Sequence, residues 1–463
     1  MNDPSHFSSP EPKSRAARRK QGQFFTPVDV AAFLAGLFDE VNNKRIVRLL
    51  DPGAGAGALS ESFARLCANA TKILTVEIDA VEQDILLAQS LEERWKGIAG
   101  RRVIQENFVF FALAELEKSA AFRVSYTHAL LNPPYVRIAR DGDEATALRK
   151  HGIHLTNLYA AFISLSLKLL SSGGELVAIV PRSFCNGRQY QSLRTQILRE
   201  SSIERIHVID SRRDAFKHDG VIQENVILKL RKGAPQGDIE VSFSKNSTFE
   251  DTRKYQRPFA EVVEVSDESS VFRLADKDMP LRLTGARYPL ALVSLSVSTG
   301  QVVDFRVALH LRSFISSETA PLIHAHHITE GGLEWPTSEP EKMNALVVDP
   351  TTKKFLMPRG HYVVVRRFSS KEQPRRVVAA YVNATTAEFR DGVAFENHVN
   401  FFHVNRQGLE RLLAVGLADF LNSSEVDDFI RAVSGSTQIN VSDLKLMKFP
   451  GRDELSSRGT TAE

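Results

Sequence analysis

The stretch LLDPGAGAGALS, residues 49–60, decides the fold of the first half of the chain. The apolar run 46–50 is predicted to be a buried strand, and the residues after the glycines have a helical pattern. Gly53, Gly55 and Gly57 let the backbone turn tightly between the two and approach a ligand closely. This order of strand, glycine turn and helix is typical of the first unit of a nucleotide-binding α/β sheet, although ordinary tight turns also contain glycines.

Apolar runs alternate with helical patterns from Gln21 to about Leu230. The predicted buried strands are IVRLL (46–50), ILTVEI (73–78), THALL (127–131) and ELVAIV (175–180), and the predicted helices are 26–38, 58–70 and 157–170. Nearly continuous apolar strands that alternate with helices predict a mostly parallel sheet covered on both faces. The runs 205–210 and 225–230 have no strong helix between them, so we expect an antiparallel hairpin at the sheet edge.

A change of composition divides the chain into domains. Residues 231–238, RKGAPQGD, are rich in Gly, Pro and charge, which predicts a boundary near residue 235. We therefore expect an α/β domain over 21–235 and, because the later pattern is mixed, an α+β domain over 236–463. Residues 1–20 are polar and end in basic residues, which predicts a disordered arm that either touches a polyanion or is a solvated tail.

The bulk composition excludes several classes of protein. The chain has 463 residues, 43% hydrophobic and 25% charged, as in soluble globular proteins. Neither a signal peptide nor an apolar run of transmembrane length is found in the sequence. Cys67 and Cys185 have no metal-ligand spacing, so we expect no disulfide framework, no metal site and a cytoplasmic location. The net charge of +3 permits an anionic partner without requiring one.

Two acidic residues indicate the kind of ligand that the glycine loop takes. Asp51 puts an anion into the loop, and no Gly-Lys-Ser/Thr sequence follows it. This favours a ligand of positive character, such as S-adenosylmethionine, over a nucleoside triphosphate. Glu77 follows Gly53 by 24 residues. In dinucleotide-type sites an acid at about that distance ends the second strand and binds ribose hydroxyls.

Two further segments have both a structural and a functional interpretation. Thr26 and Pro27 fit the N-cap and first position of a helix, whose free N–H groups also suit a carboxylate. Asn107 and Phe108 lie between the second and third long apolar strands. They are either core and loop residues, or a hydrogen-bond acceptor for an adenine amine and a ring that stacks on a purine.

The segment LLNPPYVRI, residues 130–138, has the clearest chemistry. Pro133 and Pro134 stop the strand, so Asn132 is expected at the sheet's carboxyl edge, where ligands bind. The Asn132 side-chain oxygen and the Pro133 carbonyl then form two acceptors that face one point. Two acceptors suit an –NH₂ group, because they draw its nitrogen toward sp³ geometry and localise the lone pair. Tyr135 is expected to be an exposed ring that stacks on a flipped-out base.

Together these stretches resemble the gamma-group N6-adenine DNA methyltransferases of type II restriction-modification systems. The motifs occur in that family's order: Phe-Thr-Pro (25–27), the glycine loop, Val-Glu-Ile-Asp (76–79), Asn-Pro-Pro-Tyr (132–135) and a C-terminal target-recognition region. The resemblance covers about residues 21–230. It implies a class I methyltransferase domain with a Rossmann-like, mostly parallel sheet, a DNA-binding target-recognition domain after it, and S-adenosylmethionine as cofactor.

The resemblance also implies roles for single residues. The implied cofactor contacts are Phe25, Thr26 and Pro27 at the methionine end, Asp51, Pro52, Gly53 and Gly55 in the glycine loop, Glu77 at the ribose, and Ile78, Asn107 and Phe108 at the adenine. The implied catalytic residues are Asn132, Pro133, Pro134 and Tyr135. The family usually has Asp where this chain has Asn107, although an amide still accepts from an amine. A second aromatic usually faces the flipped base, and Phe216 is the candidate.

The C-terminal half contains a basic stretch, residues 353–376. Its cations are Lys353, Lys354, Arg359, Arg366, Arg367, Lys371, Arg375 and Arg376, against the single acid Glu372. Such a balance is expected either of a surface that contacts DNA phosphates or of a solvated pair of strands.

The resulting hypothesis is a site-specific enzyme that methylates adenine N6 in duplex DNA. It would protect host DNA from a cognate endonuclease on another polypeptide, because no nuclease constellation is found in the sequence. The alternatives are a methyltransferase for a protein glutamine amide or an RNA guanine amine, which pose the same chemical problem, and a non-catalytic DNA specificity subunit.

Overall fold

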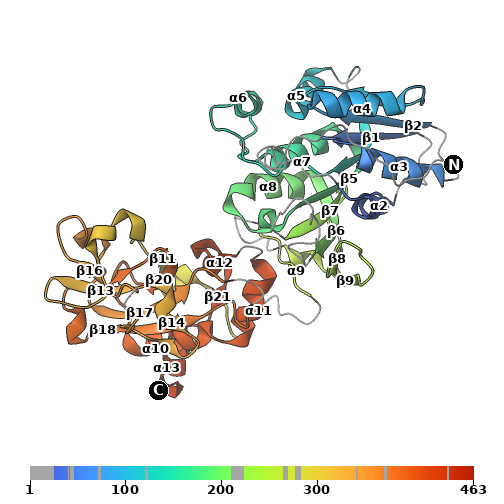
Figure 1. Cartoon of the computed structure of the whole chain (residues 1–463). Helices are drawn as coiled ribbons and strands as arrows, with labels where there is room; N and C mark the ends of the chain where they lie inside the picture. Colours follow the sequence, from blue (N-terminus) through green and yellow to red (C-terminus); the bar gives the residue numbers. More distant parts are fainter. Residues whose placement is uncertain are drawn as a thin grey trace. The chain divides into compact units, whose positions relative to one another are not determined.

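The computed structural model describes residues 26–39, 41, 46–70, 75–119, 122, 124–209, 224–263, 270–276, 283–339, 342–369, 373–434 and 437–462. The chain forms two compact units, Met1–Asp276 and Lys277–Glu463 (Figure 1). The division falls at Asp276 and not near residue 235, because strand β8 (Ile239–Ser244) continues the large sheet and strand β9 (Arg253–Arg257) pairs with β8.

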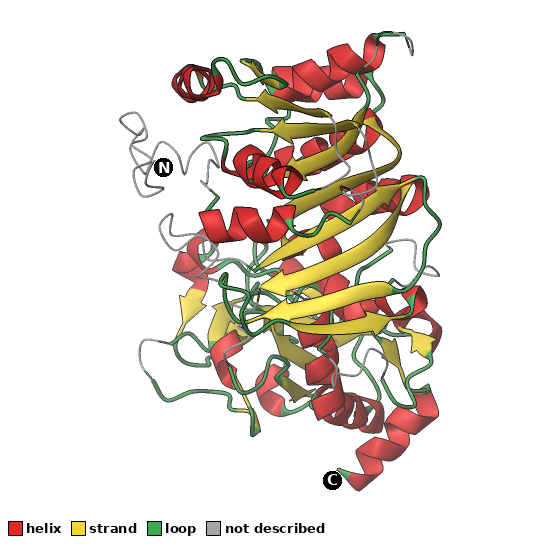
Figure 2. Cartoon of the chain, turned by 90° about the vertical axis from the view of Figure 1, so that its right-hand side faces the viewer, coloured by secondary structure: helices red, strands yellow, loops and turns green. Residues whose placement is uncertain are grey.

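The first unit is built on one large mixed sheet. Among the described residues it has nine strands in the order β3-β2-β1-β4-β5-β7-β6-β8-β9. Figure 2 shows strands of this sheet side by side, with helices beside them. The remaining strands are β1 (Ile46–Pro52), β2 (Thr75–Val81), β3 (Arg101–Ile104), β4 (Tyr126–Leu131), β5 (Leu170–Pro181), β6 (Ser201–Ile209) and β7 (Asn225–Lys232). Strands β1 to β5 are mutually parallel, whereas β7 is antiparallel to both β5 and β6. The α/β fold and the β6–β7 hairpin are therefore confirmed, but the hairpin is not at the edge because β8 and β9 lie beyond it.

Helices cover both faces of this sheet, as nearly continuous apolar strands require. They are α2 (Val28–Ala35), α3 (Ala58–Ala68), α4 (Ile85–Trp95), α5 (Phe108–Glu117), α6 (Asp143–Lys150), α7 (Leu158–Leu169), α8 (Gln191–Glu200) and α9 (Phe259–Val262). Side chains of α2, α3 and α4 pack on one face, and those of α5, α7 and α8 pack on the other. Strand β4 shows the alternation directly, since Leu130 belongs to the first core and Ala129 and Leu131 belong to the second.

The second unit combines small sheets with helices. Among its described residues, a four-stranded sheet has the order β11-β20-β17-β18, a second four-stranded sheet has the order β12-β16-β13-β19, and two strand pairs are β10–β21 and β14–β15. The strands are β10 (Tyr288–Pro289), β11 (Ser296–Thr299), β12 (Leu311–Arg312), β13 (Thr319–Ile323), β14 (Ile328–Thr329), β15 (Gly332–Leu333), β16 (Ala345–Val347), β17 (Gly360–Arg366), β18 (Ala379–Ala384), β19 (Ala394–Phe395), β20 (Val399–His403) and β21 (Lys448–Phe449).

Helices α10 (Arg411–Leu421), α11 (Ser424–Val433), α12 (Val441–Leu446) and α13 (Arg452–Thr461) complete the second unit. Glycines allow α10 and α13 to cross closely. A Cβ on Gly416 would lie 1.7 Å from the Leu455 carbonyl oxygen, and one on Gly459 would lie 2.1 Å from that of Leu412. Side chains of α10, α11, α12 and β17 share one apolar core.

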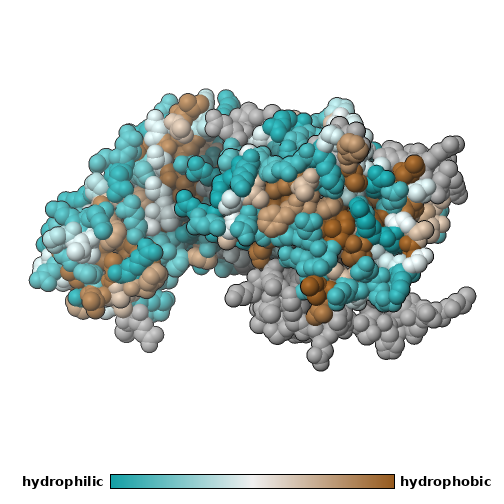
Figure 3. All heavy atoms as spheres, turned by 90° about the horizontal axis from the view of Figure 1, so that it is seen from above, coloured by the Kyte–Doolittle hydropathy of each residue, from teal (hydrophilic) through white to brown (hydrophobic). Residues whose placement is uncertain are grey.

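On the face drawn in Figure 3, hydrophilic side chains predominate and apolar ones form small separate patches. Across the described ranges, none of the helices has both the length and the apolar character needed to span a bilayer.

Candidate cofactor and catalytic site

The glycine loop after β1 has the backbone conformation that its sequence predicts. Gly53, Gly55 and Gly57 have φ angles of +73°, +55° and +82°, which side chains of L-residues rarely allow. The Gly53 N–H donates to the Val81 carbonyl oxygen at 2.8 Å, so the loop is fixed to the end of β2. A Cβ on Gly57 would lie 2.6 Å from the Leu91 side chain of α4, and together with the φ of +82° this favours glycine at the start of α3. The loop thus follows the carboxyl end of the central strand, where ligands of such sheets bind.

Asp51 is the buried acid of this loop. Its Oδ2 accepts hydrogen bonds from the Ser60 hydroxyl at 2.6 Å and the Ser60 N–H at 3.2 Å. Its Oδ1 is also buried, and no hydrogen-bond donor reaches it from the described residues. Burial raises the pKa of Asp51 to about 7, since the anion lacks solvation. An unsatisfied buried carboxylate oxygen fits a cationic ligand, such as the ammonium-bearing end of S-adenosylmethionine.

The acid at the end of β2 is Glu82, not Glu77. Glu77 pairs in register with Arg48 within β1 and β2, and its carboxylate accepts from the Arg48 Nε at 2.5 Å. Glu82 directly follows the strand and is 3% exposed. Its two oxygens accept from the Gly55 N–H and the Asp84 N–H, each at 2.8 Å. The expectation that Glu77 ends the strand is therefore wrong, and Glu82 lies against the glycine loop.

The same correction applies to Ile78. This side chain is fully buried in the core beneath α2 and α3, so it does not face a ligand at the carboxyl edge. The residue that follows the acid is Gln83. The sequence contains a signal for the later position of this acid. Residues 81–84 repeat the Val-Glu-x-Asp pattern of residues 76–79. Asp84 is the N-cap of α4 and accepts from the Leu86 N–H at 3.0 Å, which shows that the strand continues to the second copy.

Asn107 and Phe108 lie at the end of β3. Asn107 is the N-cap of α5, and its Oδ1 accepts from the Val109 N–H at 2.9 Å. Phe108 is 3% exposed and packs on the Phe162 ring, with centroids 4.7 Å apart. Phe162, which sequence reasoning missed, lies at the glycine loop, because a Cβ on Gly53 would be 3.3 Å from its ring. Phe162 lies within the predicted helix 157–170, and nothing in that periodic pattern separates it from an ordinary core residue.

Asn132 lies directly after β4, the strand beside β1. Its Nδ2 donates to the Thr26 hydroxyl at 3.0 Å. The Tyr135 hydroxyl lies 3.3 Å from the Asn132 Oδ1 and 3.1 Å from the Ile179 carbonyl oxygen of β5. Residues far apart in the sequence therefore hold this amide at the carboxyl edge.

Two expectations about this segment are wrong. Tyr135 is half-buried and packs against both cores of the unit instead of being an exposed ring, and burial raises the pKa of its hydroxyl. Thr26 does not cap α2. The N-cap is Pro27, because α2 begins at Val28, and the Thr26 side chain bonds to Asn132 instead. Phe25 and Phe216 lie outside the described residues.

The basic stretch of the second unit is only partly a free surface. Arg376 is fully buried, with its guanidinium beside Ser434, and Arg375 donates to the Asn422 carbonyl at the end of α10. Arg367 bonds to the Asn397 carbonyl and to Gln438. Lys353, Lys354 and Arg359 are exposed and Arg366 is half-exposed, as are Arg367 and Arg375, whose guanidinium groups make the contacts just described. Arg375 and Arg376 therefore hold the fold, and Lys371 lies outside the described residues.

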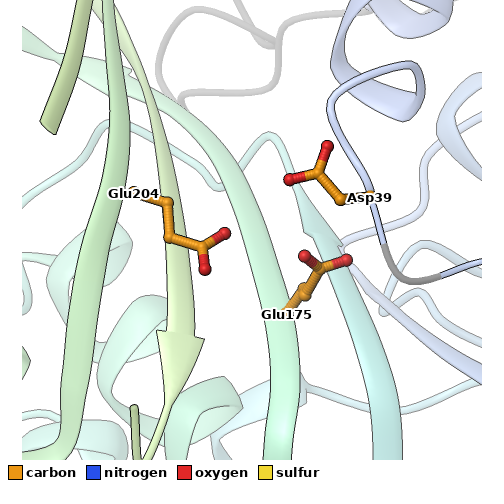
Figure 4. A group of neighbouring side chains, drawn as sticks. All are labelled: Asp39, Glu175 and Glu204. Carbon is orange, nitrogen blue, oxygen red and sulfur yellow. The ribbon is translucent and has the colours of Figure 1, made fainter. Parts of the chain in front are cut away.

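Three carboxylates of the first unit converge in a way that resembles a metal site: Asp39, Glu175 and Glu204 (Figure 4). A cation of the chain already occupies their centre. Lys229 pairs with Asp39 and lies 3.2 Å from both glutamates. Burial alone would lower the pKa of Lys229, but the Asp39 hydrogen bond and the two glutamates raise it above its ordinary value. The group is an ion-pair network that joins the end of α2 to the sheet.

The fold and the site define a class I S-adenosylmethionine-dependent methyltransferase. The family model "Eco57I restriction-modification methylase" matches residues 98–216. The type II methyltransferase M.BsuBI of Bacillus subtilis is 40% identical over 95% of this chain and 89% of its own length. M.PstI of Providencia stuartii is 34% identical over 95% and 88%. The chain therefore belongs to the type II methyltransferases, the DNA-modifying enzymes of restriction-modification systems.

A solved structure shows the same fold at low sequence identity. The type IIL restriction-modification enzyme MmeI, solved in complex with DNA, has a TM-score of 0.55 and 11% identity over 93% of this chain and 68% of that one. Membership of the DNA-methyltransferase family leaves no support for the protein-glutamine, RNA or non-catalytic alternatives.

Proposed function

We propose that this enzyme transfers the methyl group to the N6 amine of an adenine flipped out of a specific duplex sequence. The observation that carries the proposal is the Asn132 amide, held by Thr26 and Tyr135 at the end of β4. Strand β1, which leads into Asp51 and the glycine loop, is the neighbour of β4. A cofactor in the glycine loop and an amine at Asn132 would therefore meet at one edge of the sheet.

The chemistry follows from the two acceptors. The exocyclic amine of a base is a poor nucleophile, because its lone pair is delocalised into the ring. The Asn132 Oδ1 and the Pro133 carbonyl oxygen each accept a hydrogen bond from one N–H of the amine. These two bonds localise the lone pair on the amine nitrogen. S-adenosylmethionine, when bound, supplies an electrophilic methyl group, so the enzyme needs no covalent intermediate. The chain's main contribution is alignment, with the amide fixed by Thr26 and the backbone fixed by Pro133 and Pro134.

Tyr135 is proposed to hold the flipped base. Extrusion of a base costs a few kcal/mol. Stacking on an aromatic ring returns about 1–3 kcal/mol. The Tyr135 hydroxyl is anchored at Ile179, so the ring orientation is set before the base arrives. Phe216 is proposed to be the second aromatic residue that faces the flipped base.

The cofactor is proposed to lie along the carboxyl ends of β1, β2 and β3. Asp51, Pro52, Gly53 and Gly55 would contact its methionine half, together with the segment 25–27 before α2. Glu82, rather than Glu77, would bind the ribose hydroxyls. The adenine would lie near Asn107 and above the ring pair Phe108 and Phe162.

The second unit is proposed to recognise the target sequence. Its exposed cations Lys353, Lys354, Arg359 and Arg366 would contact phosphates, which fix register without reading sequence. We also propose that the enzyme acts in the cytoplasm and that the cognate endonuclease is a separate polypeptide.

The test is an incubation of the purified protein with radiolabelled S-adenosylmethionine and mixed-sequence duplex DNA, followed by digestion to nucleosides. The proposal requires label in N6-methyladenine. Label in N4-methylcytosine would contradict it, because the cytosine amine presents the same two N–H groups to Asn132.

A further inference from the structure

At the end of β3, three polar side chains form a cluster that no catalytic step uses. The Asn107 Nδ2 donates to the Gln83 Oε1 at 3.3 Å and to the Glu144 Oε1 at 3.2 Å. Gln83 follows β2, Asn107 follows β3, and Glu144 lies in the first turn of α6. We propose that Glu144 is the acceptor for the exocyclic amine of the cofactor's adenine and selects an adenosyl group over a 6-oxo purine.

The strand order directs the adenine to this cluster. Strands β3, β2, β1 and β4 are neighbours in that sequence across the sheet. The methyl donor must face Asn132, which follows β4, and the ribose meets Glu82, which follows β2. The adenine of the cofactor therefore lies beyond the carboxyl end of β2, near the end of β3, where Asn107 and Glu144 lie. This step rests on the proposed cofactor orientation.

Asn107 alone cannot supply the acceptor in its observed orientation. Its Oδ1 already accepts the Val109 N–H at the start of α5, and its Nδ2 points toward Gln83 and Glu144. The amide therefore presents its donor side to the cluster. Adenine offers a donor at N6 and an acceptor at N1, so the base needs a second protein group that accepts. The Glu144 carboxylate is such a group.

Glu144 is held in place by its helix. Leu148 of α6 is 1% exposed in the core shared with α5 and α7. His151, the residue after α6, lies 3.0 Å from the Glu117 carboxylate of α5. Glu144 itself is half-buried, and its Oε1 accepts from Asn107. A carboxylate fixed in this way, with one oxygen on Asn107, has acceptor capacity for an incoming amine.

The pair makes a specific prediction about the base. Adenine matches both groups, since its amine donates to Glu144 and its N1 accepts from the Asn107 Nδ2 in place of the Gln83 Oε1, whose contact at 3.3 Å is the longer of the two. Hypoxanthine mismatches both, because its O6 faces the carboxylate and its N1–H faces an amide donor. A site built around hydrogen bonds rejects an analogue that leaves its polar groups unpaired.

The test measures binding of S-adenosylhomocysteine and S-inosylhomocysteine by isothermal titration calorimetry to the full-length protein. Wild type is expected to favour the adenosyl compound by at least about tenfold, as one charged hydrogen bond provides. In Glu144→Gln the amide accepts from an amine but also donates to O6, so the preference should fall to about threefold or less. The affinity for the inosyl compound should rise, which a merely structural role for Glu144 would not produce.

Asp143→Asn is the matched control, because Asp143 is an exposed acid one residue away in the same helical turn. It should keep the wild-type preference. For each variant, the ratio of the two binding affinities is measured on one protein preparation. A partly unfolded fraction affects both titrations equally and does not alter this ratio. An unchanged ratio in Glu144→Gln, or a wild type without preference, would overturn the role of Glu144. A wild type that binds neither compound would overturn the cofactor site as a whole.

Discussion

The position of the ribose-binding acid can be tested by exchanging two glutamates for glutamine. Glu77 lies within β2 and pairs with Arg48, whereas Glu82 directly follows the strand and contacts the glycine loop through the Gly55 N–H. Glutamine keeps the size of the side chain but offers one acceptor oxygen instead of two. In Glu82→Gln, either the Gly55 N–H or the Asp84 N–H loses its acceptor, and the ribose hydroxyls lose a charged one.

The magnitude follows from these contacts. A hydrogen bond to a charged group contributes about 1.5–3 kcal/mol. Loss of one such bond should weaken cofactor binding about 10- to 150-fold, at tenfold per 1.4 kcal/mol. Glu77 is 38% exposed in its pair with Arg48, and exposed pairs contribute about 0–1 kcal/mol to stability and nothing to a ligand that they do not touch. Glu77→Gln should therefore bind the cofactor within about twofold of wild type.

The assay is calorimetric titration of both variants with S-adenosylhomocysteine, which binds without reacting. Thermal melts first establish that each variant is folded. The assignment would be refuted if Glu77→Gln weakened binding and Glu82→Gln did not. Equal weakening by both would also refute it, because a residue beside Arg48 has no contact with the loop.

Three further predictions concern the site and the second unit. Thr26→Val removes the partner of the Asn132 Nδ2 and should lower methylation at saturating cofactor by about 5- to 160-fold, for a loss of about 1–3 kcal/mol, whereas Thr26→Ser should stay near wild type in single-turnover assays. Because burial raises the Asp51 pKa to about 7, the ligand-free protein binds more protons than the unfolded chain between its ordinary value of 3.8 and about 7. Its stability should fall as pH rises through that window, and Asp51→Asn should flatten the slope in denaturant titrations. Arg376→Ala should lower the melting temperature, while Lys353→Ala, at an exposed cation, should leave it unchanged and weaken DNA binding in a salt-dependent titration.

The sequence predicted those features of the structure that depend on local pattern. Apolar runs identified the core of β1, β2, β4 and β5, since strands buried on both faces have no polar alternation to confuse the pattern. The glycine turn and the Asn132 strand end followed from backbone chemistry. The hairpin β6–β7 followed from the short interval between two apolar runs.

The errors concern features that pattern alone does not set. The apolar pattern ends β2 too early because two Val-Glu-x-Asp sequences lie close together, and only the capping of α4 by Asp84 distinguishes them. The change of composition at RKGAPQGD predicts a domain boundary too early, because this segment is a connection within the sheet and β8 pairs with β6. The basic pattern groups Arg376 with the DNA-contacting cations, although its side chain is fully buried, because charge in a sequence does not reveal burial.

The measurement that tests the central claim most directly compares Asn132→Ala with wild type in two assays. The first is binding of S-adenosylhomocysteine, and the second is formation of N6-methyladenine in duplex DNA at saturating cofactor. Because Asn132 is proposed to contact the target amine and not the cofactor, binding should stay within about threefold while methylation falls by on the order of 100-fold or more. Unchanged methylation by Asn132→Ala would contradict the account.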